Sequence, residues 1–150
     1  MDTIWLNYAL PCLCAFLACA GFTLVFNIHG GGMLICSLGG AMCWLIYLLA
    51  GSSIFAAFLS AAAIGVFSEV MARLRRCPVT GYLLVALLPL VPGGGIYYAM
   101  SYCVAGDIQR FLDTLLHTFG MAAALAVGAM MTASLFRAVY MHLYHPKGRK

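Results

Sequence analysis

Charged residues are scarce in this 150-residue chain: Asp, Glu, Lys and Arg make up 8%, against about 25% in an ordinary soluble domain. Residues 3–68 contain none of them, and neither do residues 77–106 or 114–136. Each of these runs reaches or exceeds the roughly 20 residues that cross a bilayer as a helix. Because 65% of the residues are hydrophobic, a water-soluble globule is excluded. The sequence predicts an all-α integral membrane protein, with residues 1–150 forming a single transmembrane domain.

Motifs for catalysis, nucleotide binding and metal binding are also missing. The sequence has no nucleophile elbow, phosphate loop or zinc-protease motif, and its four histidines have no acidic or cysteine partner at metal-ligand spacing. The seven cysteines form no C-x-x-C and mostly lie in apolar runs, where a thiol behaves as a small hydrophobe. The net charge of +4 comes from residues 73–76 and the C-terminal tail, which is typical of membrane anchoring. We therefore predict no enzyme activity, cofactor, metal site or nucleic-acid partner.

Glycine, serine and proline divide the apolar sequence into five predicted transmembrane helices. These cover about residues 4–26, 33–50, 54–72, 79–104 and 115–142. The positive-inside rule places both basic clusters, at residues 73–76 and 147–150, in the cytoplasm. Two crossings must then separate the clusters, so the fourth segment crosses as well. We expect an outside N-terminus and a cytoplasmic C-terminus.

The fourth predicted span is interrupted near its middle by Pro89, Pro92 and glycines 93–95. A proline inside a helix removes a backbone donor and clashes with the preceding turn, at a cost of about 3 kcal/mol or more. We expect two half-helices, residues 79–88 and 96–104, joined by unwound backbone. Unpaired peptide groups at membrane depth are tolerated only where protein covers them or water lines them. This pattern favours a cavity.

The interrupted segment is the candidate substrate site. Free N–H groups at the start of the second half-helix would attract a carboxylate, and tyrosine hydroxyls add further donors. The candidate substrate-binding residues are Pro89, Pro92, Gly93, Gly94, Gly95, Tyr97 and Tyr98. The alternative interpretation is a proline kink covered by neighbouring helices.

Three further residues are candidates for gating or proton transfer. Glu69 lies four residues before Arg73, a spacing that favours an ion pair on one helix face. An acidic residue in or near a span is also a candidate proton relay or gate, so a structural pair and a functional pair both stay open. Asn27 ends the first span and is more typical of a helix C-terminus than of a ligand.

Small residues recur every four positions in two spans, which favours close helix packing. They are Ala57, Ala61 and Gly65 in the third span, and Gly120, Ala124, Gly128 and Thr132 in the fifth. The packing partner is either another helix of the same chain or a second subunit.

Several stretches together resemble the threonine/serine exporter family, and in particular its short, two-component form. They are residues 21–27; Ser68, Glu69, Ala72, Arg73 and Pro78; and Pro89, Pro92, Gly93, Tyr97, Ala99 and Met100. The resemblance covers about residues 20–105. The glycine triplet 93–95 departs from it, since relatives often carry a bulkier residue there.

The resemblance implies a small subunit in the bacterial cytoplasmic (inner) membrane. It would work beside a larger homologous membrane subunit that carries a hydrophilic N-terminal domain. The exported substrates would be threonine and serine, or succinate. A homo-oligomer also stays open. The competing hypotheses are a non-transporting scaffold or assembly subunit and, more remotely, a membrane thiol oxidoreductase.

Overall fold

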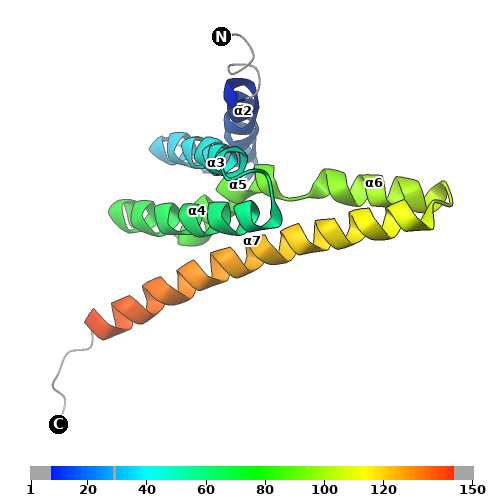
Figure 1. Ribbon diagram of the computed structural model, residues 1–150. Helices are drawn as coiled ribbons and strands as arrows, with labels where there is room; N and C mark the ends of the chain where they lie inside the picture. Colours follow the sequence, from blue (N-terminus) through cyan, green and yellow to red (C-terminus); the bar gives the residue numbers. More distant parts are fainter. Residues whose placement is uncertain (1–7, 29, 144–150) are drawn as a thin grey trace.

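The computed structural model describes residues 8–28 and 30–143, and every regular element in these residues is helical, as predicted. Figure 1 shows their arrangement. The elements are α2 (Leu10–Val25), α3 (Gly31–Leu49), α4 (Ile54–Arg75), α5 (Val79–Leu87), the short 3-10 helix η2 (Leu88–Leu90), α6 (Gly93–Val104) and α7 (Ile108–Leu143).

The lengths of these helices agree with the prediction of about five spans. In the described residues, α3, α4 and α7 are each long and apolar enough to cross a membrane. The segment from α5 through α6 passes the same test as a bent pair, and α2 is a shorter apolar helix of 16 residues. The fourth span is therefore broken, as expected.

Four of the helices end in the same tight turn. After each end the chain adopts a positive φ, at Ser52 as well as Gly51 after α3, and the N–H after the first such residue donates to the carbonyl five positions earlier at 2.9–3.1 Å. This is the Schellman motif, which satisfies carbonyl groups that the helix leaves unpaired. The first positive-φ residues of the four turns are Asn27, Gly51, Arg76 and Gly106. Each turn reverses the chain so that consecutive helices pack as antiparallel neighbours.

The packing of α4 against α7 confirms that the small-residue faces meet within one chain. Gly120 contacts Ile54, Gly128 contacts Phe58 and Ala61, and Gly65 contacts Thr132. The Thr132 hydroxyl also donates to the carbonyl of Ala62 at 3.2 Å. Because these contacts advance in the same direction along both helices, α4 and α7 are parallel. Their C-terminal halves therefore lie at the same end of the molecule.

The core of the bundle lies between α3, α4 and α5 and contains mostly small side chains. Its fully buried members include Cys43, Ala57, Ala61, Ile64 and Ala86. Small residues let the helix backbones approach closely, which is the main source of helix association in lipid. The core thus separates one end of the bundle from the other.

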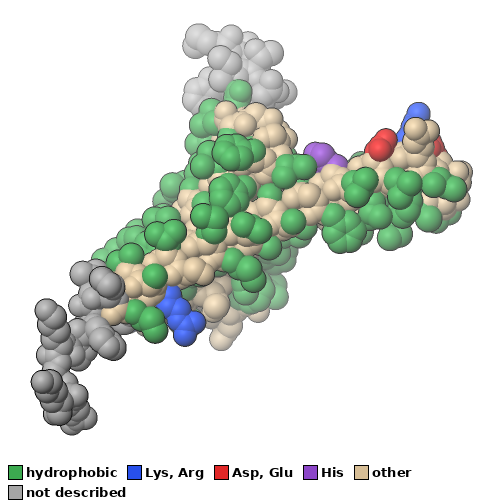
Figure 2. Space-filling model, turned by 60° about the horizontal axis from the view of Figure 1, so that its bottom comes forward, with side chains coloured by type: hydrophobic (Ala, Val, Ile, Leu, Met, Phe, Trp, Pro, Cys, Tyr) green, Lys and Arg blue, Asp and Glu red, His purple; other side chains and the backbone are tan. Residues whose placement is uncertain are grey.

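A two-helix arm extends beyond this bundle. Figure 1 shows α6 beside the first third of α7, past the N-terminal end of α4. Acidic and basic side chains gather at its tip, as Figure 2 shows, whereas hydrophobic side chains cover much of the remaining visible surface. Asp107 and Arg110 form an ion pair there at 3.3 Å, close to Asp113.

The uncharged part of α7 gives a scale for the membrane. Residues 114–136 span about 34 Å at 1.5 Å per residue, close to the roughly 30 Å of a hydrocarbon core. Asp113 and Arg137 mark the two limits of this run. We call the end near Arg73, Arg75 and Arg137 the basic end, and the other the arm end.

Candidate functional site

The interruption of the fourth span is shorter than predicted. Only Val91 and Pro92 separate η2 from α6, and the two parts are bent by 45°. Glycines 93–95 are not unwound, contrary to the prediction, but form the first turn of α6. A helix can begin directly after Pro92 because the first turn needs no N–H from that position.

A cavity of about 330 Å³ lies beside this break. It is lined by Trp44, Tyr47, Pro89, Leu90, Val91, Pro92, Gly94, Gly95, His117, Thr118 and Met121. Four of the predicted site residues therefore share one cavity. Gly93, Tyr97 and Tyr98 do not line it, and the Tyr97 side chain is 71% exposed. Exposed tyrosines near the charged tip of the arm are typical of a membrane–water interface.

The backbone at the start of α6 presents hydrogen-bond donors to the cavity. Gly94 and Gly95 occupy the first turn, where N–H groups have no carbonyl partner within the helix. Thr118 lies so close to Gly95 that a Cβ there would collide with its hydroxyl. The glycine therefore allows α6 to pack closely against α7.

Trp44 is a cavity residue that the sequence did not indicate. Its indole nitrogen is buried and has no hydrogen-bond partner among the described residues. A lone tryptophan in an apolar run is a weak signal, because the sequence does not reveal which segments surround it. In the structure, Trp44 lines the same cavity as the start of α6.

The break lies nearer the arm end than the middle of the membrane segment. Gly95 is beside Thr118, which is about 7 Å along α7 from the charged residue Asp113. The expectation of a break near the middle was based on sequence position within the span. Because α7 has 36 residues, the arm extends past α4, and the break therefore lies closer to the arm end.

Glu69 and Arg73 form the expected ion pair, with 3.3 Å between Oε2 and Nη2. The Arg73 guanidinium also lies over the ring of Phe136, 5.5 Å from its centroid, and so connects α4 to α7. Glu69 is 14% exposed, whereas Arg73 is 45% exposed. These contacts fit the structural role that the sequence left open, and they do not test proton transfer.

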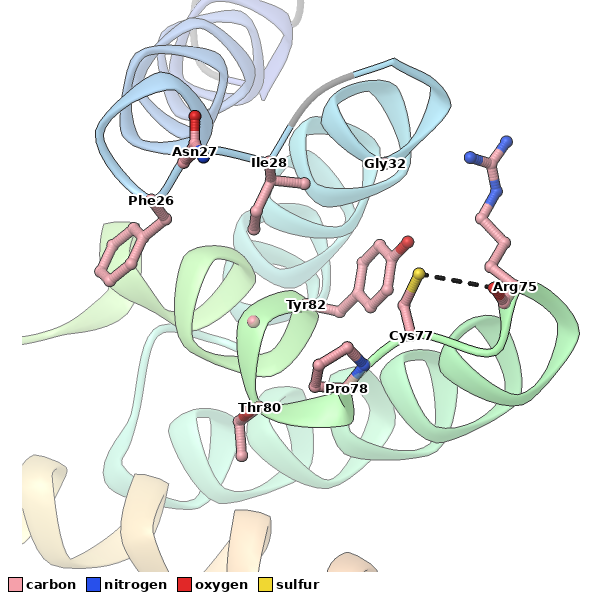
Figure 3. A pocket seen from close by; sticks show the side chains of 10 residues that line it. Phe26, Asn27, Ile28, Gly32, Arg75, Cys77, Pro78, Thr80 and Tyr82 are labelled. Carbon is pink, nitrogen blue, oxygen red and sulfur yellow. Dashed lines mark hydrogen bonds between the residues drawn. The ribbon is translucent and has the colours of Figure 1, made fainter.

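A second cavity, of about 420 Å³, opens at the basic end and is drawn in Figure 3. It is lined by Phe26, Asn27, Ile28, Gly32, Arg75, Cys77, Pro78, Thr80, Gly81 and Tyr82. These residues come from the α2–α3 and α4–α5 connections and from the helix ends beside them. Asn27 thus has two roles, since it forms the turn after α2 and also lines this cavity.

No metal-binding group is found in the described part of the chain. No cluster of three or more His, Cys, Asp or Glu side chains occurs among those residues. All seven cysteines are free, and Cys19, Cys36 and Cys43 are buried within the helix packing. Their burial fits the role of small hydrophobic residues.

Comparison with known proteins gives one positive result. The family model described as "Threonine/Serine exporter, ThrE" matches residues 11–135 of the 150-residue chain. Neither the curated proteins nor the solved structures give a match. The matched residues include the lining of both cavities.

Proposed function

Because the chain belongs to the threonine/serine exporter family, we propose that it is the small subunit of a two-component secondary exporter. The family is a transporter family, and the chain has the apolar helices of a multi-pass membrane protein. The proposed substrates are small metabolites with a carboxylate, namely threonine and serine, or succinate. The proposed location is the bacterial cytoplasmic membrane.

The observation that carries this proposal is the interrupted fourth span beside a cavity. Gly94 and Gly95 line it from the first turn of α6, where backbone N–H groups have no carbonyl partner within the helix. Donors at a helix start are suited to a substrate carboxylate. We propose that this cavity is part of the transport path, with the break at Pro89 and Pro92 as the place about which the two parts of the span move.

The proposed orientation places the basic end in the cytoplasm. Arg73 and Arg75 lie at the C-terminus of α4, and α7 runs parallel to α4. A cytoplasmic basic end therefore agrees with the positive-inside rule and with a cytoplasmic C-terminus. The tail at residues 147–150 lies outside the described residues.

The proposed partner is a larger homologous subunit. Five crossings leave the two ends of a chain on opposite sides, so a related five-span unit inserted the other way would form an inverted pair. The arm supports this idea, because α6 packs mainly against α7. A partner that covers the arm would also complete the cavity at the break.

The scaffold hypothesis is weakened by the packing of α7. It relied on the face that carries Gly120 and Gly128, and α4 of the same chain covers that face. The face is therefore not available to another protein.

Export can be tested in cells that lack or contain this chain and its candidate larger subunit. We expect low intracellular threonine, serine or succinate only when both are present. Transport of these substrates by proteoliposomes that contain this chain alone would contradict the two-component proposal.

The site can be tested with two leucine substitutions. Gly94 lines the cavity, and a Cβ added to it would have no other atom within 4 Å, so Gly94→Leu should fill the cavity without moving the backbone. We expect membrane insertion to survive and export to stop. Gly21→Leu is the control, since Gly21 is equally free of neighbours but lies on the exposed surface of α2. Export that is unchanged in Gly94→Leu would remove the site assignment.

A further inference from the structure

The cavity at the basic end has an unusual concentration of positive charge. α3 begins at Gly31 and α5 begins at Val79, and residues of both first turns line the cavity. Each helix N-terminus carries a partial positive charge and free N–H groups. Two such ends therefore meet at one opening.

Arg75 adds a full positive charge to this place. A Cβ on Gly31 would collide with the Arg75 guanidinium, so the guanidinium lies directly against the start of α3. Arg75 also ends α4, where a cation is favourable, yet its side chain reaches the N-terminus of another helix, where a cation is unfavourable. No carboxylate in the described part of the chain forms an ion pair with it.

Tyr82 supplies a buried polar group on the same side of the cavity. Its side chain is 5% exposed, and Figure 3 shows its hydroxyl pointing toward the space between Gly32 and Arg75. Its hydroxyl is next to the thiol of Cys77, which is a weak hydrogen-bond partner. An oxygen ligand would satisfy this hydroxyl better than a thiol does.

None of the ten residues that line the cavity is acidic. The cavity thus combines a guanidinium, two helix N-termini and a buried hydroxyl, with no acidic side chain in its lining to balance them. Guanidinium and backbone N–H groups are the usual partners of a carboxylate, and charged hydrogen bonds to them are the strong ones.

We propose that this cavity is a carboxylate-binding site in which Arg75 and Tyr82 hold the substrate on the cytoplasmic side before export. The inference rests on the proposed function for the direction of transport. It adds a second binding site, separated from the cavity at the break by the buried core around Val85 and Ala86. Substrate would occupy the two sites in turn.

Binding by the purified chain in detergent micelles tests this site without any transport. The probe is succinate, because it carries carboxylates and no ammonium, and the readout is isothermal titration calorimetry. We expect saturable binding that Arg75→Gln weakens by about tenfold or more and Tyr82→Phe weakens less. Arg76→Gln is the matched control, because Arg76 carries the same charge on the next residue and does not line the cavity.

Two results would overturn the proposal. One is wild-type protein that binds no succinate, and the other is equal weakening by Arg75→Gln and Arg76→Gln. An anionic lipid headgroup offers similar chemistry, so retention of phosphatidylglycerol is measured by native mass spectrometry on the same variants. Lipid retention that depends on Arg75, without succinate binding, is a case of the first result and would identify a lipid site instead.

The two proposals fail in different ways. Succinate binding without export by the two-subunit system would contradict the proposed function and leave the binding site in place. Export that is unaffected by Arg75→Gln, together with absent binding, would contradict the site alone.

Discussion

Replacing Gly128 with alanine should loosen the packing of α7 against α4. A Cβ at this position would lie 2.7 Å from the carbonyl oxygen of Phe58 and 2.9 Å from the Ala61 Cβ. The first of these atoms belongs to a helix backbone, which cannot move aside like a flexible side chain. The two helices must therefore separate along the contact.

The expected cost follows from two opposing effects. Alanine gains about 1 kcal/mol over glycine as a helix former. Overpacking costs about 1–3 kcal/mol, and the hydrogen bond from Thr132 to Ala62, worth about 0.6 kcal/mol, lengthens as the helices part. We expect a net loss of about 1–2 kcal/mol in the free energy of unfolding.

Unfolding by SDS in mixed micelles, followed by circular dichroism, measures this loss. Gly21→Ala is the control, because nothing lies within 4 Å of a Cβ at Gly21 in α2. It should leave stability unchanged or raise it by up to about 1 kcal/mol. The reasoning is refuted if Gly128→Ala is as stable as the wild type, or if both variants are equally destabilised.

Four more substitutions, at three positions, separate structural from functional roles. Thr132→Val keeps the shape but removes the hydroxyl, whose single proton is shared between the carbonyls of Ala62 and Gly128, so unfolding in SDS should show a loss of about 0.6 kcal/mol. Asn27→Gly should keep both stability and export. Asn27→Ala should lose about 1 kcal/mol in the free energy of unfolding, because a positive φ disfavours alanine. Loss of export in both variants would instead make the Asn27 side chain a ligand. Glu69→Gln should retain export in the two-subunit assay if the pair with Arg73 is structural, and a loss of export with normal stability would favour proton transfer.

The helices and the broken span could be predicted from the sequence. The absence of charged residues identified the apolar segments. The small residues at positions 120, 128 and 132 indicated the contact that α7 makes with α4. Local chemistry decides these features, since they depend on composition and on spacing within one helix.

The length and depth of the break were harder to predict. The glycine triplet looked like unwound backbone, yet a helix begins at Gly93, because the first turn needs no N–H from Pro92. The depth of the break in the membrane depends on how far α7 extends past α4, which only the packed structure reveals. Tyr97 and Tyr98 were expected at the site but lie on the outside of the arm.

The cavity at the basic end could not be predicted as a unit. Its lining comes from two connections that are far apart in the sequence, and Asn27 alone among these residues had been a candidate site residue. The position of Arg75 beside the start of α3 results from the turn at Arg76, where an arginine adopts a conformation that usually favours glycine. The positive charge of this cluster was evident from the sequence, but the direction of its side chains was not.

Water access at the break tests the central claim most directly. In a cysteine-free background, single cysteines at positions 84, 86 and 94 can be treated with a membrane-impermeant maleimide in intact cells. The account predicts that Gly94→Cys reacts, while Ala86→Cys, buried in the core, and Leu84→Cys, on the exposed surface of α5, do not. An unreactive Gly94→Cys would contradict a water-lined cavity, and reaction at all three positions would indicate a loop outside the bilayer.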